Sequence, residues 1–286
     1  MTQVDQFESV FRSATKPVFR PAGVELERIL VVTDLPPSEA QAFGARIEAF
    51  LRHATSIESA TFSTVAGVEA RSTGALLQLV EDAAPSLVCA YRNLYSDGWK
   101  WPHSLGEALD LLTQTTEAPV LVLPNPKEGA VAEHALQNVN QVMAVTDHLA
   151  GDDRLVNWAV AMTQDGGTLT LGHVEDENVF ERYMSVIGRI SSIDTDNARE
   201  RIHRRLLKEP GDYIESVREA LAKNKTPVTV KSEIRLGNQL SDYRSLVKDH
   251  EVDMLVLNTR DDEQLAMHGL AYPIAVEIRD IPLLML

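Results

Sequence analysis

Short, uninterrupted apolar runs alternate along this chain with stretches in which apolar residues recur every three or four positions. The runs RILVVTD (28–34) and QVMAVTD (141–147) end in the same Val-Thr-Asp tripeptide, and APVLVLP (118–124) and IPLLML (281–286) close each half of the sequence. Such runs between helical patterns are typical of parallel strands that helices cover on both faces. The repetition predicts two α/β units in tandem.

The first unit is assigned to residues 28–126. Its predicted strands lie at 28–34, 57–65, 86–91 and 120–123. Apolar residues at helical spacing predict three helices between these strands, and Ser38 is the expected N-cap of the first one. Residues 1–27 form an N-terminal extension, and the turn-forming residues that begin at Pro124 lead into a linker at 127–137.

The second unit is assigned to residues 138–286 and is longer. Residues 178–225 form a helical region that has no counterpart in the first unit, which lacks one αβ step. The predicted strands lie at 141–147, 168–174, 228–234, 252–258 and 281–286. Alternating β and α segments joined by right-handed crossovers predict an α/β fold with two tandem doubly wound, Rossmann-type parallel sheets.

The order and spacing of these segments resemble the universal stress protein family in its tandem, two-domain form. The resemblance rests on the two Val-Thr-Asp endings, on LTLGHVEDE (169–177), on DMLVLNTR (253–260) and on the terminal IPLLML. It implies that the two units pair inside one chain as separate family members pair in dimers. It also implies a role in stress response.

Nucleotide-binding members of that family carry a loop of the form G-x-x-G-x9-G-[ST] after the fourth strand, where backbone N–H groups and a helix N-terminus hold phosphate. Here Asn258 and Asp261 stand at the first two glycine positions, and Gly269 falls two residues early. The acidic residues at 261–263 would repel a triphosphate. Neither half has an intact loop, so no cofactor is expected, and AMP or ATP is kept only as an alternative ligand.

The resemblance also points to candidate ligand positions at the carboxyl ends of the strands. An aspartate beside the topological switch point of such a sheet can accept hydrogen bonds from an adenine or a ribose. The favoured alternative is a loop aspartate that caps the next helix or orders the end of the strand. The candidate ligand-binding residues are Thr33, Asp34, Thr146, Asp147, Asn258 and Arg260.

Signals for catalysis or metal binding are weak. A group of histidines and carboxylates in the second unit matches no known metal-ligand spacing, and no metal site is assigned. The members of this group are His148, Asp152, Asp153, His173, Glu175 and Asp176. Cys89 has no obvious catalytic partner. No catalytic residue is assigned, so the chain is expected not to be an enzyme.

Composition narrows the classes of partner. With 42 acidic against 27 basic residues the net charge is −15, which argues against nucleic acid and against an anionic membrane. The single cysteine, Cys89, excludes an intramolecular disulfide and favours a reducing compartment. The N-terminus lacks the pattern of a signal peptide, and no apolar run approaches the roughly 20 residues of a membrane span. A cytoplasmic location is expected.

Three segments are candidate contact surfaces. The aromatic loop at 91–103 could bind a ligand or partner, although packing of its rings between the two units is favoured. The arginine-rich piece at 198–208 is either a solvated helix face, which is favoured, or a docking site for an acidic partner. An amphipathic pattern at 4–11 predicts a short helix against the first unit or a neighbouring chain.

The sequence therefore predicts a non-enzymatic regulatory protein of the stress response. It would act by protein contacts, self-association in a homodimer included, or through an undefined small ligand. The alternative functions are an AMP or ATP sensor with a degenerate phosphate loop and a metal-dependent enzyme.

Overall fold

The computed structural model describes residues 16–54, 57, 59–67, 71–98, 104–127, 132, 134–259 and 270–286. The described strands are β1 (Arg28–Val32), β2 (Thr61–Val65), β3 (Leu87–Tyr91), β4 (Val120–Leu123), β5 (Gln141–Val145), β6 (Thr168–Asp176), β7 (Thr229–Gly237), β8 (Met254–Leu257) and β9 (Leu283–Met285). The described helices are α2 (Pro37–Leu51), α3 (Thr73–Ala83), α4 (Glu107–Thr115), α5 (Asp153–Met162), α6 (Glu177–Ile187), α7 (Thr195–Asn224), α8 (Gln239–Asp249) and α9 (Ala271–Glu277).

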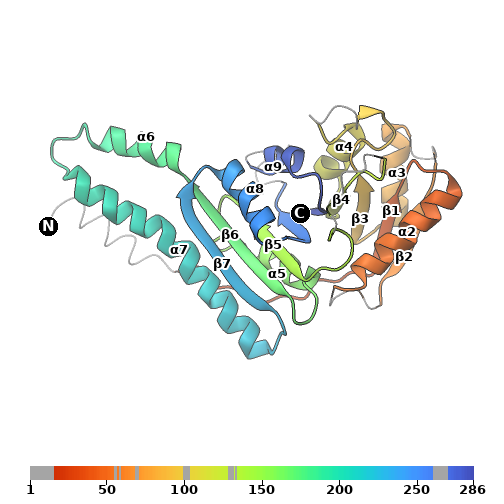
Figure 1. Cartoon of the computed structure of the whole chain (residues 1–286), viewed down its shortest axis with the longest axis horizontal. Coiled ribbons are helices and arrows are strands. Elements are labelled where there is room, and N and C mark those ends of the chain that lie inside the picture. Colours follow the sequence, from red (N-terminus) through yellow and green to blue (C-terminus); the bar gives the residue numbers. More distant parts are fainter. Residues whose placement is uncertain are drawn as a thin grey trace.

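The described strands form one nine-stranded sheet in the order β2-β1-β3-β4-β9-β8-β5-β6-β7 (Figure 1). Neighbouring strands are parallel except for β4 and β9, which pair antiparallel with Val120 opposite Met285. The predicted α/β fold with doubly wound parallel strands is confirmed, but the two predicted sheets are joined into one by the pairing of β4 with β9. Because the sheet runs through both halves of the chain, the division at 127–137 stays a prediction.

The burial of each strand follows its place in the sheet. Every residue of the inner strands β3, β4, β8 and β9 is buried, and all four are continuous apolar runs. The edge strands β2 (TFSTV) and β7 (TVKSEIRLG) are more polar and partly exposed. Polar and charged edge strands discourage pairing with a further strand, so the sheet ends there.

Two sequence-based expectations about helices are wrong. Ser38 does not cap the first helix, since α2 begins at Pro37 with Pro36 at the N-cap and has no side-chain cap. Proline suits this position because its φ is already helical and its missing N–H would have no partner there.

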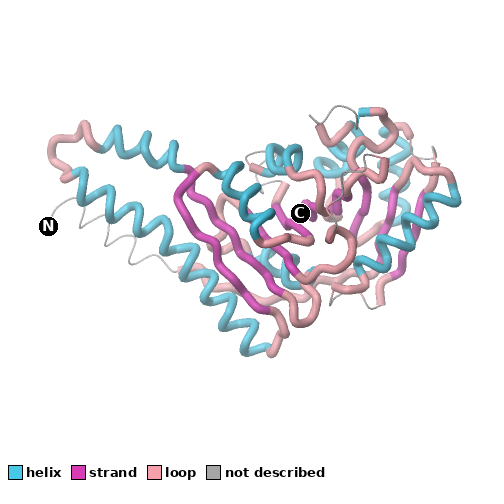
Figure 2. The backbone as a smooth tube through the Cα atoms, in the orientation of Figure 1, coloured by secondary structure: helices cyan, strands magenta, loops and turns pink. Residues whose placement is uncertain are grey.

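The region at 178–225, predicted as one helical region, contains two helices. They are separated between Gly188 at the end of α6 and Asp194, whose carboxylate caps α7. We call α6 together with the first half of α7 (177–209) the arm. The arm projects from the rest of the molecule beyond the strand β7 (Figures 1 and 2).

The described chain begins with a segment that packs against the second half of the sequence, although it directly precedes the first half. Residues 16–24, which we call the strap, contact α5 and α7 before the chain enters β1. The amphipathic pattern predicted at 4–11 lies outside the described residues.

Candidate functional site

Asp34 lies just beyond the end of β1, which has β2 on one side and β3 on the other. This is the first topological switch point of the sheet, where doubly wound proteins bind ligands. The Asp34 carboxylate accepts hydrogen bonds from the Tyr91 hydroxyl and from the backbone N–H of Tyr95 (3.2 Å). Lys127 donates to both of its oxygens, at 2.9 and 2.8 Å. The side chain of Asp34 is only 10% exposed, so protein groups occupy its carboxylate.

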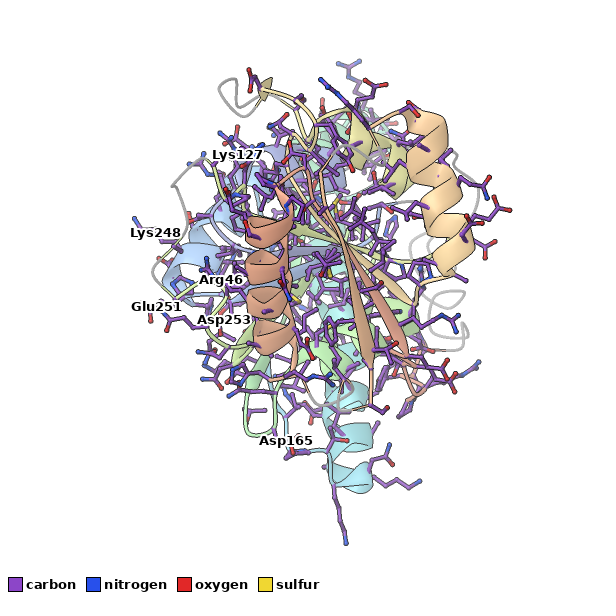
Figure 3. The ribbon with its side chains drawn as sticks, turned by 90° about the vertical axis from the view of Figure 1, so that its right-hand side faces the viewer. Arg46, Lys127, Asp165, Lys248, Glu251 and Asp253 are labelled. Atoms are coloured by element: carbon purple, nitrogen blue, oxygen red, sulfur yellow. The ribbon has the colours of Figure 1, made fainter. Side chains whose placement is uncertain are left out.

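Tyr91 and Lys127 complete this cluster although the sequence singled out neither as a partner of Asp34. Burial, with the hydrogen bond to Asp34 as a second cause, raises the pKa of the Tyr91 phenol, which therefore stays protonated and donates. Its oxygen in turn accepts from the backbone N–H of Asp34 (3.0 Å). Lys127 follows β4 and lies beside the end of α2 at which that helix begins (Figure 3). Because β1, β3 and β4 are parallel, their carboxyl ends lie at one edge of the sheet. The positions of Tyr91 and Lys127 at or just after strand ends could therefore have identified them as partners of Asp34.

Thr33 has a structural role. Its backbone N–H and its hydroxyl both donate to the carbonyl of Val65, each at 3.1 Å, and the side chain is fully buried. Thr33 therefore ties the end of β1 to the end of β2.

The second Val-Thr-Asp ending has different surroundings. Asp147 is exposed, and its carboxylate accepts a hydrogen bond of 3.3 Å from the Gln239 side chain. The Thr146 hydroxyl accepts from the backbone N–H of His148 at 3.4 Å. Identical tripeptides thus have unlike surroundings, and within the described residues no lysine pairs with Asp147 as Lys127 pairs with Asp34.

At the second switch point, between β5 and β8, a hydrogen bond joins Asn258 to Asp152. The Asn258 side-chain amide, just after β8, donates to the Asp152 carboxylate at 2.5 Å. Asp152 is also the N-cap of α5 and accepts from the backbone N–H of Leu155 at 3.0 Å. Burial raises the pKa of Asp152, and the hydrogen bonds from Leu155 and Asn258 oppose that shift. Arg260, the remaining candidate, lies outside the described residues, as do the acidic residues 261–263.

The raised pKa of Asp152 predicts a pH dependence for the variant Asp152→Asn. As the pH rises above 3.8, the ordinary pKa of an aspartate, Asp152 ionises more readily in the unfolded chain than in the folded one. Wild type therefore loses stability with rising pH, and the asparagine variant does not suffer this loss. Asparagine can also retain the cap. The unfolding free energy of the variant relative to wild type should rise with pH and level off above the folded-state pKa. Urea denaturation from acid to neutral pH measures this, and a difference independent of pH would contradict it.

The histidines and carboxylates weighed as a metal site serve other contacts. His173 pairs with Glu175 at 3.3 Å, Asp176 caps α6, and Asp153 accepts from the Tyr213 hydroxyl at 2.7 Å. Within the described ranges, no group of three or more His, Cys, Asp or Glu residues could hold a metal ion. Burial raises the pKa of the Cys89 thiol, which keeps it protonated and a poor nucleophile.

The aromatic loop begins with residues that join the two halves. Arg92 is buried, and its guanidinium donates to the carbonyls of Ala275 and Ile278 (2.5 Å to Ile278) at the end of α9. A positive charge there also suits the negative end of the helix dipole. Arg92 thus joins the two halves, but the Tyr91 ring packs edge-on against Phe43 of the first half, with centroids 5.5 Å apart, so the expectation that the rings of the loop pack between the units is wrong for Tyr91. Residues 99–103, with both tryptophans, lie outside the described residues.

The arginine-rich piece forms ion pairs within the arm and along α7. Arg199 donates to Glu181 of α6 (2.8 Å for one of its two bonds) and lies over the Phe180 ring at 5.5 Å. Lys208 pairs with Asp212 at 2.7 Å, one turn away. These contacts agree with a solvated helix face that also fastens α6 to α7.

In the part of the chain that the structure describes, no helix is both long and apolar enough to span a membrane.

No protein-family model matches the chain, and no curated protein matches it. Solved structures do. A universal stress protein from Archaeoglobus fulgidus superposes with a TM-score of 0.51 at 11% identity, over 92% of this chain and 97% of that one. A functionally unknown protein from Pseudomonas aeruginosa superposes with a TM-score of 0.50 at 13% identity, over 91% and 92%. Identities this low establish a common fold and nothing finer. The chain therefore has the fold of the universal stress proteins.

Proposed function

We propose that the chain is a regulatory universal stress protein of the tandem form, which acts through protein contacts and catalyses no reaction. The observation that carries the proposal is the state of the two switch points. Asp34 is bound by Tyr91 and Lys127 at the first, and Asn258 is bound by Asp152 at the second. A ligand that reached either carboxylate would have to break bonds that the protein already makes.

The helix that follows β3 gives further support. A helix N-terminus attracts phosphate through its free N–H groups and its dipole. The first turn of α4, however, carries Glu107 and Asp110, and a glycine is present only at the N-cap, Gly106. Two carboxylates at this position oppose an incoming phosphate. We place the protein in the cytoplasm and assign it no cofactor.

The arm offers a surface for the proposed contacts. Tyr183, Val186 and Ile190 recur at helical spacing on α6 and the turn after it, with 58%, 57% and 44% of their surface exposed. Neighbouring apolar side chains exposed to this extent mark interaction surfaces. In the first half, each described connection between successive strands contains a single helix, α2, α3 or α4, so the paired helices of the arm are a feature of the second half.

The proposal predicts that the purified protein binds neither ATP with Mg²⁺ nor AMP. Isothermal titration at millimolar nucleotide should give no saturable heat, and the melting temperature should not move. Saturable binding with one or two sites per chain would contradict the proposal.

One observation favours the alternative, a nucleotide sensor with a degenerate loop. Asn258 Oδ1 is buried and has no hydrogen-bond partner among the described residues, so a ligand N–H or hydroxyl at the second switch point could donate to it. If the titration detects nucleotide, the same titration of Asn258→Ala decides where it binds. Loss of binding would assign the nucleotide to this switch point.

A further inference from the structure

The strap, residues 16–24, is held in a groove between α5 and α7 of the second half. The Phe19 side chain is buried, and its ring meets the Tyr213 ring edge-on, with centroids 6.3 Å apart. At the start of the strap, the Lys16 ammonium pairs with Asp212 at 2.9 Å. One ring and one charge thus fix the strap by its side chains.

The rest of the recognition is directed at the strap backbone. The N–H of Phe19 donates to Ser216 Oγ at 3.0 Å, and that of Arg20 to Asp153 Oδ1 at 3.3 Å. Asn157 bonds the backbone twice, since it accepts from the N–H of Ala22 at 2.9 Å and donates to the carbonyl of Arg20 at 3.1 Å. Side chains that read the main chain of an extended segment are a general mode of peptide recognition.

The sequence of the strap fits this mode. Proline has no backbone N–H, and the two prolines of the strap, Pro17 and Pro21, are not among the residues whose N–H groups bond to the groove. Proline also favours an extended chain. The groove residues Asp153 and Asn157 on α5, like Asp212 and Ser216 on α7, are one helical turn apart and therefore face the strap together.

The strap does not fill its groove. A cavity of about 310 Å³ lies between residues 21–24 and the two helices, lined on the helix side by Asn157, Val160, Ala161, Leu221 and Asn224. A Cβ placed on Gly23 would meet no atom within 4 Å. A larger side chain than glycine would therefore fit at this position of a bound peptide.

We propose that the α5–α7 groove is a recognition site for extended peptides, which the protein's own strap occupies in cis. Its ligand is a segment with a phenylalanine three residues after a lysine. The backbone N–H groups of the phenylalanine, of the residue after it and of the third residue after it must be free to donate. A peptide of this pattern enters the groove when the strap leaves it. This proposal goes beyond the proposed function and does not depend on whether the switch points bind nucleotide.

The test uses the full-length chain and a fluorescent peptide with the strap sequence, KPVFRPAGV (16–24). The variant Phe19→Asp places a carboxylate against Tyr213 and beside Asp153, which should release the strap. Because a tethered segment competes at an effective concentration near millimolar, we expect the peptide to bind this variant about ten-fold or more tighter than wild type. Val18→Asp is the matched control, since Val18 is 62% exposed, and it should behave as wild type.

Two further measurements make the test decisive. Adding Asn157→Leu to Phe19→Asp should abolish peptide binding, because both backbone bonds of Asn157 are lost. Equal binding to wild type and Phe19→Asp, or none to a folded Phe19→Asp, would overturn the proposal. If Phe19→Asp does not fold, Phe19→Ala replaces it. Hydrogen exchange of wild type is an independent measurement. The amides of Phe19, Arg20 and Ala22 should exchange slowly, and fast exchange would contradict a docked strap.

Discussion

Replacing Arg92 by alanine is expected to lower the free energy of unfolding by roughly 3–5 kcal/mol, as removing one partner of a buried charged contact does. Arg92 is 1% exposed, and its guanidinium donates to the carbonyls of Ala275 and Ile278. The variant would leave these carbonyls without that donor, open a cavity and remove a contact between the two halves. Urea denaturation followed by circular dichroism measures the loss.

Two variants calibrate this result. Arg46→Ala removes an arginine from the exposed face of α2 (Figure 3) and should change stability by no more than about 0.5 kcal/mol. Arg92→Lys keeps the charge but cannot present two donors in a fixed fork, so an intermediate loss is expected. A loss for Arg92→Ala as small as that for Arg46→Ala would show that the contact with α9 is not important for stability.

The second large effect is expected for Asp34→Ala, with a loss of roughly 2–3 kcal/mol, because buried donors lose their acceptor. The Tyr91 hydroxyl and the backbone N–H of Tyr95 would lose their bonds, and Lys127 would lose its ion pair. Since Asp34 contributes to the raised pKa of Tyr91, that phenol should also ionise at a lower pH, which ultraviolet absorbance detects.

Asp147→Ala is the matched control for Asp34→Ala, because both aspartates end the same tripeptide. Asp147 is exposed and accepts a long hydrogen bond (3.3 Å) from Gln239, so removal of its carboxylate should cost no more than about 0.5 kcal/mol. Equal losses of unfolding free energy for the two variants would contradict the difference between the surroundings of Asp34 after β1 and of Asp147 after β5.

Most of the fold could be predicted from the sequence because strands buried on both faces are written as continuous apolar runs. The runs at 118–124 and 281–286 contain β4 and β9, the pair that joins the two halves of the sheet. The start of α2 was missed because the prolines at 36 and 37 end the extended segment themselves. The break between α6 and α7 was missed because the helical pattern on both sides hid it.

The candidate site was predictable only in part. Asp34 and Asn258 were found because their position after a strand places them at a switch point. Their partners were not, because Lys127 is 93 residues from Asp34, and Asp152 is 106 residues from Asn258. Nor could the sequence separate Asp34 from Asp147, since the difference lies in which side chains the tertiary fold brings to each. The contact of Lys16 with Asp212 spans 196 residues, and no local pattern predicts it.

Because the protein's own side chains occupy both switch points, we expect that no nucleotide binds there. Mass spectrometry of the small molecules released when the purified protein is denatured tests this most directly. We expect a supernatant without AMP or ATP. Either nucleotide, at close to one molecule per chain or more, would contradict it and make the protein a nucleotide sensor.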